Sequence, residues 1–516
     1  MTWRIRSRSS QRSHPLPPYP STTETKLLPA QRARADTSRR YLKNPKKPPK
    51  GMALLQLHHL SLHSLPFTPK LHHSRFSTRK SLRFSFSASA STTMAKQVLV
   101  PVANGTEPME AVITIDVLRR SGAEVMVASV EKELRVDACH GVKIVADALV
   151  GDCKDTGFDL IALPGGMPGA TNFKDCAVLE SVVKKQAADG RLYAAVCASP
   201  AVALGSWGLL KGLKATCYPS FMEQLSSCAT AVESIVQQDG KVVTSRGPGT
   251  TMEFSVALVE QLYDKEKADE VSGPLLLRPN HGDEYKVIEL NPMEWKCNNI
   301  PQILVPIADG SEEMEAVMII DILRRAKANV VVASVGDNLE ILASRKVKLV
   351  ADMLLDEAAK LSYDLIVLPG GLGGAQAFAN SDKLVNMLKK QAESNKPYGA
   401  ICASPALVLE PHGLLKGKKA TAFPAMCNKL SDQSFIDNRV VVDGNLITSR
   451  GPGTSMEFAL GIVEKFFGRP KALELAKLLI SHAENHMYGI IFMILLKRKT
   501  IVAFYYQLED KLDLQY

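Results

Sequence analysis

Short runs of apolar residues along this chain alternate with segments whose apolar residues recur every three or four positions. The runs predict buried strands, and the segments predict helices that lie on a sheet. Strands are predicted at residues 98–102, 125–130, 159–163 and 192–196, and helices at 110–120, 173–188 and 252–263. Strands that alternate with helices favour a mostly parallel sheet covered by helices. Ligands of such sheets bind beyond the carboxyl ends of the strands.

The whole pattern occurs twice, at an offset of 205 positions that falls to 204 near the end. The matching segments are 98–130 with 303–335, FDLIALPGG at 158–166 with YDLIVLPGG at 363–371, and TSRGPGTTMEF at 244–254 with TSRGPGTSMEF at 448–458. We therefore predict two copies of one α/β domain, at residues 95–270 and 301–479, joined by a linker at 271–300.

Charge is distributed unevenly along the chain. Residues 1–93 carry 18 Lys and Arg but only two Asp and Glu, whereas the remaining residues carry 45 and 51. This leader is rich in Ser, Arg and Pro and cannot bury a core. Its composition is typical of an organellar transit peptide and favours the chloroplast, although a disordered basic tail or untranslated sequence would share it. Translation from Met94 would instead give a cytoplasmic product without the leader.

The rest of the chain argues against several classes of function. Its net charge is mildly negative, so it does not predict the basic surface that is typical of nucleic-acid binding. Nine cysteines without paired spacing indicate neither a disulfide framework nor a metal site, and they fit a reducing compartment. The segment 480–516 has no counterpart in the first copy, and its apolar run at 490–496 is far below the roughly 20 residues that cross a bilayer. That tail is either an additional helix or a gene-model artefact, and we predict no membrane partner.

The two copies share a cysteine at the end of a predicted strand, Cys197 in LYAAVCASP and Cys402 in YGAICASP. Ser199 and Pro200 are typical of an N-cap and a first-turn proline, so the cysteine would project from a turn into a helix. The positive end of that helix would favour the thiolate. One such cysteine is as easily a packing residue, but two at equivalent positions favour a reactive group.

A glutamate follows the first strand of each copy, Glu110 in GTEPME and Glu315 in GSEEME. A carboxyl in an apolar pocket has a raised pKa; it can donate to a thiolate or, once ionised, take a proton from carbon. Acidic residues also favour helix starts for structural reasons. That structural interpretation suits Glu107, Glu312 and Glu313 better than Glu110 and Glu315.

Two glycines directly follow a predicted strand in each copy, Gly165-Gly166 and Gly370-Gly371. Glycines at this place let backbone N–H groups approach a substrate oxygen, although a tight turn explains them equally well. The G-x-G-x-x-G spacing of a dinucleotide site is missing, so the motif predicts no cofactor.

Two other motifs carry weaker signals. Arg246 and Arg450 precede the last helix of each copy and could hold a helix end, a subunit interface or a carboxylate product; a structural role is favoured. Cys139-His140 resembles a Cys-His nucleophile pair, but the second copy lacks it, so it is not part of the repeated plan.

Taken together, the LPGG, CASP, G[TS]E-x-ME and TSRGPGT motifs resemble those of the DJ-1 family in the DJ-1/PfpI superfamily, across almost all of both copies. The tandem arrangement resembles plant members of the homolog B type. The resemblance implies an α/β fold of two tandem flavodoxin-like three-layer sandwiches with mostly parallel sheets, similar to class I glutamine amidotransferases. It also implies an internal pseudo-dimer of the two copies and leaves a homo-oligomer open.

The resemblance also implies site residues. Those for catalysis are Cys197, Glu110, Cys402 and Glu315, and those whose backbone N–H groups would form the oxyanion position are Gly166, Ala198, Gly371 and Ala403. Tyr218 and Phe423 stand where DJ-1 proteins have a histidine close to the cysteine, and an alanine follows each cysteine. No Cys-His dyad is therefore expected, which argues against PfpI-type protease or amidase chemistry.

The activity that the resemblance implies is that of a glyoxalase that uses small dicarbonyl substrates and needs neither glutathione, metal nor other cofactor. It would convert methylglyoxal or glyoxal to lactate or glycolate and protect against carbonyl and oxidative stress, and early glycation adducts would be related substrates. The alternative is a non-enzymatic stress protein, a redox sensor or chaperone whose cysteine oxidises to the sulfinate. Both functions need the same cysteine and glutamate, so the sequence leaves both open.

Overall fold

The computed structural model describes residues 95–278 and 285–479, which belong to one compact unit. Residues 1–94, 279–284 and 480–516 lie outside the described residues, and with them the predicted transit peptide and the C-terminal tail. Within the described ranges, no helix is both long enough and apolar enough to cross a membrane.

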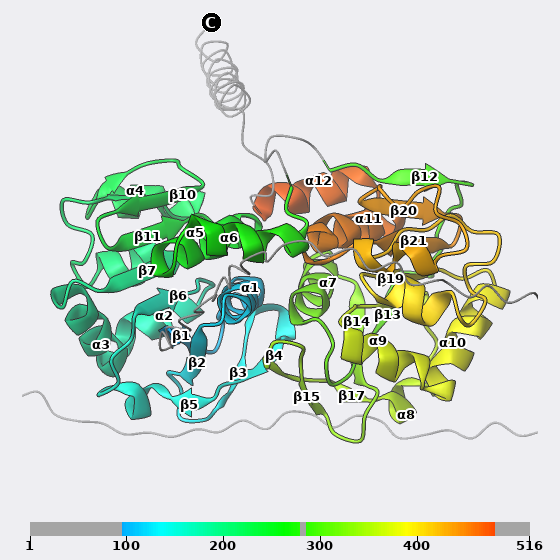
Figure 1. The fold of residues 1–516 in the computed structure, drawn as a ribbon, viewed down its shortest axis with the longest axis horizontal. Coiled ribbons are helices and arrows are strands. Elements are labelled where there is room, and N and C mark those ends of the chain that lie inside the picture. Colours follow the sequence, from blue (N-terminus) through cyan, green and yellow to red (C-terminus); the bar gives the residue numbers. More distant parts are fainter. Residues whose placement is uncertain (1–94, 279–284, 480–516) are drawn as a thin grey trace, which may run out of the picture. The chain divides into compact units, whose positions relative to one another are not determined.

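The first repeat is built on a seven-stranded sheet of order β10-β11-β7-β6-β1-β2-β5 (Figure 1). Neighbouring strands are parallel except for the antiparallel pair β10–β11. The strands are β1 (Gln97–Val102), β2 (Glu124–Ser129), β5 (Ala148–Leu149), β6 (Leu160–Leu163), β7 (Leu192–Val196), β10 (Val236–Asp239) and β11 (Val242–Ser245). A separate short pair consists of β8 (Lys214–Ala215) and β9 (Thr230–Ala231).

The second repeat has the same sheet with one more strand, in the order β12-β20-β21-β19-β18-β13-β14-β17. The additional strand β12 (Ile288–Leu290) comes from the segment that the sequence predicted as a linker, and it pairs parallel with β20 (Val440–Asp443). The other strands are β13 (Gln302–Ile307), β14 (Asn329–Ser334), β17 (Met353–Leu354), β18 (Leu365–Leu368), β19 (Tyr398–Ile401) and β21 (Leu446–Ser449).

Helices cover both faces of each sheet. Alternate residues of β1 show this: Val98 packs in the core that contains Phe254 of α5, whereas Leu99 packs in the core that contains Phe173 of α2 and Leu179 of α3. In the first repeat the helices are α1 (Pro108–Arg120), α2 (Gly169–Asp175), α3 (Ala177–Ala188), α4 (Met222–Ser226), α5 (Thr251–Leu262) and α6 (Lys265–Ser272). In the second repeat they are α7 (Glu313–Arg325), α8 (Leu355–Ala358), α9 (Leu372–Ala379), α10 (Asp382–Glu393), α11 (Ser455–Phe467) and α12 (Arg469–Leu478). The predicted α/β sandwich with a mostly parallel sheet is confirmed.

One helix was predicted too long. The segment 173–188 contains the end of α2 and the whole of α3, which are separated at Cys176. The backbone of Cys176 is extended, with φ −85° and ψ 99°, so the helix cannot continue through it.

The two repeats contact each other through a small sheet and two helices. The antiparallel sheet β15-β16-β4-β3 takes two strands from each repeat, and β4 (Lys143–Val145) pairs directly with β16 (Lys348–Val350). Its outer strands are β3 (Arg135–Asp137) and β15 (Glu340–Leu342). Helices α1 and α7 pack against each other beside this sheet (Figure 1). The first turn of each of these helices carries a predicted site glutamate, so the repeat boundary lies near both candidate sites.

Candidate active site

Cys197 occupies a strained corner at the carboxyl end of β7. Its φ of 64° lies in the left-handed region, which residues other than glycine rarely adopt. Two hydrogen bonds hold this corner: Cys197 N–H donates to Ser245 O at 3.0 Å, and Tyr218 N–H donates to Cys197 O at 2.8 Å. Backbone strain of this kind persists only where the surroundings impose it, and it concentrates at functional positions.

Glu110 lies in the first turn of α1 and faces the same corner. Glu107 caps that turn, because its carboxylate Oε2 accepts the Glu110 N–H at 2.8 Å. Glu110 Oε2 accepts the Gly165 N–H at 2.7 Å, and the carboxyl lies within hydrogen-bonding range of the Cys197 thiol. Glu110 Oε1 is buried and has no N–H or O–H partner among the described residues. One carboxyl oxygen is therefore fixed by the backbone, and the other is left for the thiol or a ligand.

Burial sets the protonation of this pair. Burial raises the pKa of Glu110 to about 7, against the lowering effect of the hydrogen bonds from Gly165 and Cys197. Glu110 is fully buried, whereas Cys197 keeps 8% of its surface exposed. A carboxyl that titrates near neutrality beside a sulfur can exchange a proton with that sulfur or with a bound molecule.

The prediction of an acidified thiol is wrong. Burial raises the pKa of Cys197 well above its usual value, and the Glu110 carboxylate raises it further; the hydrogen bond from the Gly166 N–H to the sulfur lowers it. Ser199 does not cap a regular helix, because its backbone is helical and its hydroxyl donates to Pro164 O at 2.5 Å. A π-helix follows at Pro200–Gly205. Any effect of this short helix end is outweighed by the cost of burying a thiolate.

The second repeat reproduces the arrangement. Cys402 has φ 63° and is 9% exposed, and burial raises the pKa of its thiol well above the usual value. Glu315 is fully buried, its Oε2 accepts the Gly370 N–H at 2.7 Å, and burial raises its pKa to about 7. Glu312 caps the helix through a 2.7 Å hydrogen bond from the Glu315 N–H. The chain therefore holds two copies of one cysteine–glutamate pair.

The structure places one predicted oxyanion residue of each repeat, a glycine, against the cysteine sulfur. The N–H groups of Gly166 and Gly371 donate toward the cysteine sulfurs of their own repeats. Both glycines have a positive φ, 91° and 86°. A Cβ at either would lie 2.3 Å from the backbone of the loop that leads into α1 or α7. Ala198 and Ala403 directly follow the cysteines and are buried, at 1% and 5% exposure.

Residues that the sequence treated as secondary have structural contacts. Arg450 Nη1 donates to Asp437 O at 3.3 Å, and the backbone N–H of Arg246 donates to Thr250 Oγ1 at 3.2 Å. Tyr218, which stands where the resembling proteins have a histidine, donates from its hydroxyl to Leu478 O at 3.0 Å.

The Cys139-His140 pair does not form a dyad. His140 Nδ1 lies 2.8 Å from Asp321 Oδ2 of the other repeat, whereas Cys139 Sγ contacts Gly105 O at 3.2 Å. Burial raises the pKa of Cys139 to about 11, with a further contribution from the Glu107 charge.

Sequence reasoning missed the four residues that connect the two sites. Glu107 and Glu312 were interpreted as structural acids of a helix start, and each does cap a site helix. Each also binds an arginine of the other repeat, Arg325 and Arg120 respectively. Their recurrence at equivalent positions of both repeats was the available signal.

Three buried carboxylates, those of Asp116, Glu312 and Glu313, bring ligand oxygens within 4.8 Å of one another near the second site. Arg120 pairs with two of them, Asp116 and Glu312. Positive charge is thus already supplied there by the protein itself.

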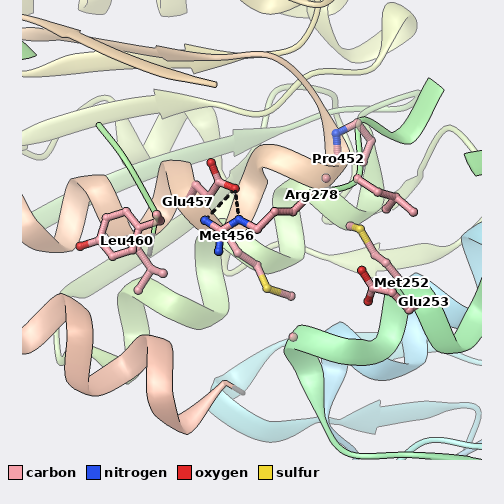
Figure 2. A pocket seen from close by; sticks show the side chains of 11 residues that line it. Met252, Glu253, Arg278, Pro452, Met456, Glu457 and Leu460 are labelled. Carbon is pink, nitrogen blue, oxygen red and sulfur yellow. Dashed lines mark hydrogen bonds and ion pairs between the residues drawn. The ribbon is translucent and has the colours of Figure 1, made fainter. Parts of the chain in front are cut away.

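A separate pocket lies between residues of both repeats. Figure 2 shows Met252 and Glu253 of α5 on one side and Met456 and Glu457 of α11 on the other. Arg278 Nε donates to Glu457 Oε1 at 3.0 Å within it. Neither Cys197 nor Cys402 lines this pocket.

The chain is similar in sequence to several other proteins. Protein DJ-1 homolog B of Arabidopsis thaliana is 69% identical over 435 residues, which cover 83% of this chain and 99% of the relative. Protein DJ-1 homolog A of the same plant is 67% identical and covers 74% of this chain and 98% of the relative. A glutathione-independent glyoxalase of Caenorhabditis elegans, DJR-1.2, is 34% identical over 182 residues and covers 35% of this chain and 95% of that protein.

One solved structure is similar to part of the chain. The crystal structure of Drosophila melanogaster DJ-1beta is 38% identical, covers 36% of this chain and all of its own, and gives a TM-score of 0.35. The sequence profile of the DJ-1/PfpI family matches residues 96–261 and again residues 301–465. The resemblance inferred from the motifs is thereby confirmed, and the chain belongs to the DJ-1/PfpI family, whose domain it carries twice.

Proposed function

We propose that each repeat is a glutathione-independent glyoxalase that converts methylglyoxal to lactate and glyoxal to glycolate. The observation that carries this proposal is the buried pair of Cys197 and Glu110, in which the pKa of the carboxyl is about 7, and its copy at Cys402 and Glu315. A base with this pKa is half ionised at neutral pH, which suits reversible proton transfer at carbon.

The reaction begins when the Cys197 sulfur adds to the aldehyde carbon of methylglyoxal. The thiol proton passes to the aldehyde oxygen, and a hemithioacetal forms. The Glu110 carboxylate then removes the hydrogen from that carbon and returns a proton to the neighbouring carbonyl carbon through an enediol. The product is a thioester of lactate, and water cleaves it to release lactate and restore the thiol. Each turnover consumes one water. The aldehyde carbon is oxidised and the neighbouring carbonyl carbon is reduced, so no external oxidant or reductant is needed.

The groups around the sulfur support each step. The Gly166 N–H that points toward Cys197 Sγ can stabilise negative charge that develops on an oxygen bound next to the sulfur. Tyr218 replaces the histidine of a Cys-His dyad, so Glu110 is the titratable partner that the sulfur has. The high pKa of the thiol is compatible with this route, because the carboxylate beside it can accept the proton as the sulfur attacks and pass it to the aldehyde oxygen, which leaves the carboxylate ionised for the next step.

Relatives agree with this assignment at the level of the family, since the protein DJR-1.2 is named as a glutathione-independent glyoxalase. The test is lactate formation from methylglyoxal without glutathione by the wild type, Cys197→Ala, Cys402→Ala and the double variant. We expect each single variant to keep the activity of the remaining site and the double variant to keep none. Lactate formation by a well-folded double variant would contradict the proposal.

A redox-sensing stress function is the second candidate, and the unpartnered Glu110 Oε1 favours it. That oxygen can share a proton with a cysteine sulfinate and so stabilise the oxidised state. Glu110→Gln combined with Glu315→Gln separates the two functions, because the amide cannot act as the carbon base, whereas its N–H group can still donate a hydrogen bond to a sulfinate. Loss of lactate formation together with intact protection against peroxide would favour the redox function over the enzyme.

Removal of early glycation adducts from proteins is an additional activity that the same site could perform.

The place of action is also a proposal. We propose that residues 1–93 direct the chain to the chloroplast and that a product starting at Met94 stays in the cytoplasm. Fluorescent fusions of the full chain and of the chain from Met94 test this, with loss of plastid signal expected only for the second.

A further inference from the structure

Each site glutamate is linked to an arginine of the other repeat through one intervening carboxylate. Arg325, the last residue of α7, donates from Nη2 to Glu107 Oε1 at 2.8 Å. The other oxygen of that carboxylate accepts the backbone N–H of Glu110 at 2.8 Å. An arginine of the second repeat thus holds the cap of the helix that carries the glutamate of the first.

The same link occurs in the opposite direction. Arg120, the last residue of α1, donates from Nη2 to Glu312 Oε1 at 2.9 Å. Glu312 Oε2 accepts the backbone N–H of Glu315 at 2.7 Å. Because two independent copies show the contact, it is part of the repeated plan rather than the accident of one surface.

Both ends of the link are fixed in a buried setting. Arg325 Nε also donates to Asp321 one turn earlier in α7, and Asp321 in turn pairs with His140 of the first repeat at 2.8 Å. Glu107 is 4% exposed and Asp321 is fully buried. Hydrogen bonds between charged groups are strong in such surroundings, and an uncompensated carboxylate there is costly.

The arginine also acts on the site electrostatically. The charged and titratable groups that face Glu110 are Cys197, Glu107, Asp321 and Arg325. Arg325 lowers the pKa of Glu110, whereas Asp321 raises it. The groups that face Glu315 are Cys402, Asp116 and Arg120. The cap Glu312 faces Glu315, Asp116 and Arg120, and also Glu313, which has no counterpart in the first repeat.

We propose that each active site is completed by the other repeat: Arg325 is the positioning residue for Glu110, and Arg120 is the positioning residue for Glu315. The arginine fixes the cap carboxylate, the cap fixes the first turn of the helix, and that turn directs the carboxyl at the thiol. Damage to an arginine therefore disables the site in the opposite repeat and spares the site in its own. This inference rests on the proposed function only where lactate formation is the readout.

The test uses backgrounds with one working site. Arg325→Gln is introduced into Cys402→Ala, where Cys197 alone works, and into Cys197→Ala, where Cys402 alone works. Because Arg325→Gln displaces the Glu110 carboxyl, we expect it to lower kcat of the Cys197 site by at least about tenfold. We expect kcat of the Cys402 site to stay within about twofold of its value without the substitution. Arg120→Gln is expected to give the reverse pattern.

The matched control is Arg324→Gln. Arg324 neighbours Arg325, is equally buried, and also crosses the repeat boundary, where it donates to His140 O at 3.0 Å and Gly141 O at 2.9 Å. It does not bind either cap carboxylate. We expect Arg324→Gln to lower kcat of both sites by a similar, small factor. That factor measures any general loosening of the boundary between the repeats.

A second readout needs no turnover. The rate of iodoacetamide labelling at Cys197 and Cys402 is followed against pH by peptide mass spectrometry in the otherwise unaltered chain. In Arg325→Gln the loss of positive charge raises the pKa of Glu110, so the profile of Cys197 is expected to move to higher pH while that of Cys402 stays unchanged. Arg325→Lys, which keeps the charge and causes less disruption, is expected to restore the Cys197 profile.

The outcomes separate the two proposals. If the wild type forms no lactate but the arginine variants show the crossed labelling pattern, the glyoxalase proposal is refuted and the arginine link is supported. Equal damage at both cysteines, or damage confined to the repeat that carries the substitution, would overturn the link. If Arg325→Gln does not fold, an Arg325→Lys variant with equal rate losses at both sites would overturn it as well.

Discussion

The backbone N–H of Gly165 donates to Glu110 Oε2 at 2.7 Å, and the glycine at the same time leaves room for the site. A Cβ at this position would lie 2.6 Å from Cys197 Cβ and 2.8 Å from Glu110 Oε2. Gly370 has the same relationship to Cys402 and Glu315, at 2.4 Å and 2.6 Å. The carboxyl and the thiol can therefore meet only because no side chain stands between them.

Gly165→Ala is expected to separate the pair. The added methyl group must displace the Cys197 side chain or the Glu110 carboxyl, and overpacking of this kind costs about 1–3 kcal/mol of unfolding free energy. In the Cys402→Ala background we expect lactate formation to fall by at least about tenfold because the carboxyl is misplaced. Gly151→Ala is the control, since no atom lies within 4 Å of its Cβ position. Full activity of a folded Gly165→Ala variant would show that the contact is not needed.

Glu110→Gln is expected to remove the base without changing the shape of the site. The amide oxygen can still accept the Gly165 N–H, so folding should be preserved. In the Cys402→Ala background, lactate formation should fall by about 10²–10⁴-fold, the usual contribution of a general base. Iodoacetamide labelling of Cys197 provides the control that the thiol is still present and reachable. A variant with more than about a tenth of the activity would exclude Glu110 as the base.

The activity of the wild type is expected to rise with pH through about 7. The carboxylate must be ionised to take the proton from carbon, and burial raises the pKa of both Glu110 and Glu315 to about 7. Below that pH the carboxyl is protonated and the reaction slows tenfold per pH unit. The measurement is kcat from about pH 5 to about pH 9 in each single-site background. An acid limb near the ordinary pKa of glutamate would contradict the buried base.

Glu313→Gln is expected to stabilise the protein at high pH. Glu313 accepts hydrogen bonds from Ser344 Oγ at 2.7 Å and from the Arg345 N–H at 2.9 Å, yet burial raises its pKa to about 7. Because the folded pKa lies above the unfolded value of 4.5, its contribution to stability is lost as pH rises from about 4.5 to about 7. The neutral amide avoids that loss, on the order of 3 kcal/mol at pH 8 and close to zero at pH 4.5.

Unfolding by urea at pH 4.5 and pH 8 measures this difference. Glu357→Gln is the control, since Glu357 is exposed on α8 and pairs with Lys360 at the surface. Equal effects of Glu313→Gln at the two pH values would show that the carboxyl is not held in its uncharged form.

The sequence predicted what local patterns determine. Apolar runs such as 98–102 and 192–196 are long and continuous, so the parallel sheet and the place of Cys197 at its edge follow from periodicity. The strands that join the repeats could not be found in this way. β4 has only three residues, Lys143–Val145, and its partner Leu349 lies about two hundred positions away, so no local signal marks the pairing.

The site was predicted by position but not by protonation. Recurrence of Cys197 and Glu110 in both copies identified the pair, whereas the sequence cannot show that Cys197 is only 8% exposed. Burial, and not the helix end, then decides the pKa of the thiol. The role of Arg325 was equally hidden, because it depends on a contact with Glu107 that only the packing of α1 against α7 creates.

The carboxylates of Asp116, Glu312 and Glu313 are expected not to bind a divalent cation in the wild type, although three oxygens within 4.8 Å form a set that Mg²⁺ or Mn²⁺ accepts. Arg120 forms ion pairs with Asp116 and Glu312, and Ser344 Oγ and the Arg345 N–H occupy Glu313. A cation would have to displace these partners from a buried place. We expect an excess of EDTA to leave kcat unchanged, and Mg²⁺ to leave the melting temperature unchanged. Arg120→Gln should reverse this outcome, because it removes the compensating charge, so that Mg²⁺ or Mn²⁺ then raises the melting temperature. A rise already present in the wild type would show that the arginine and a cation share the site.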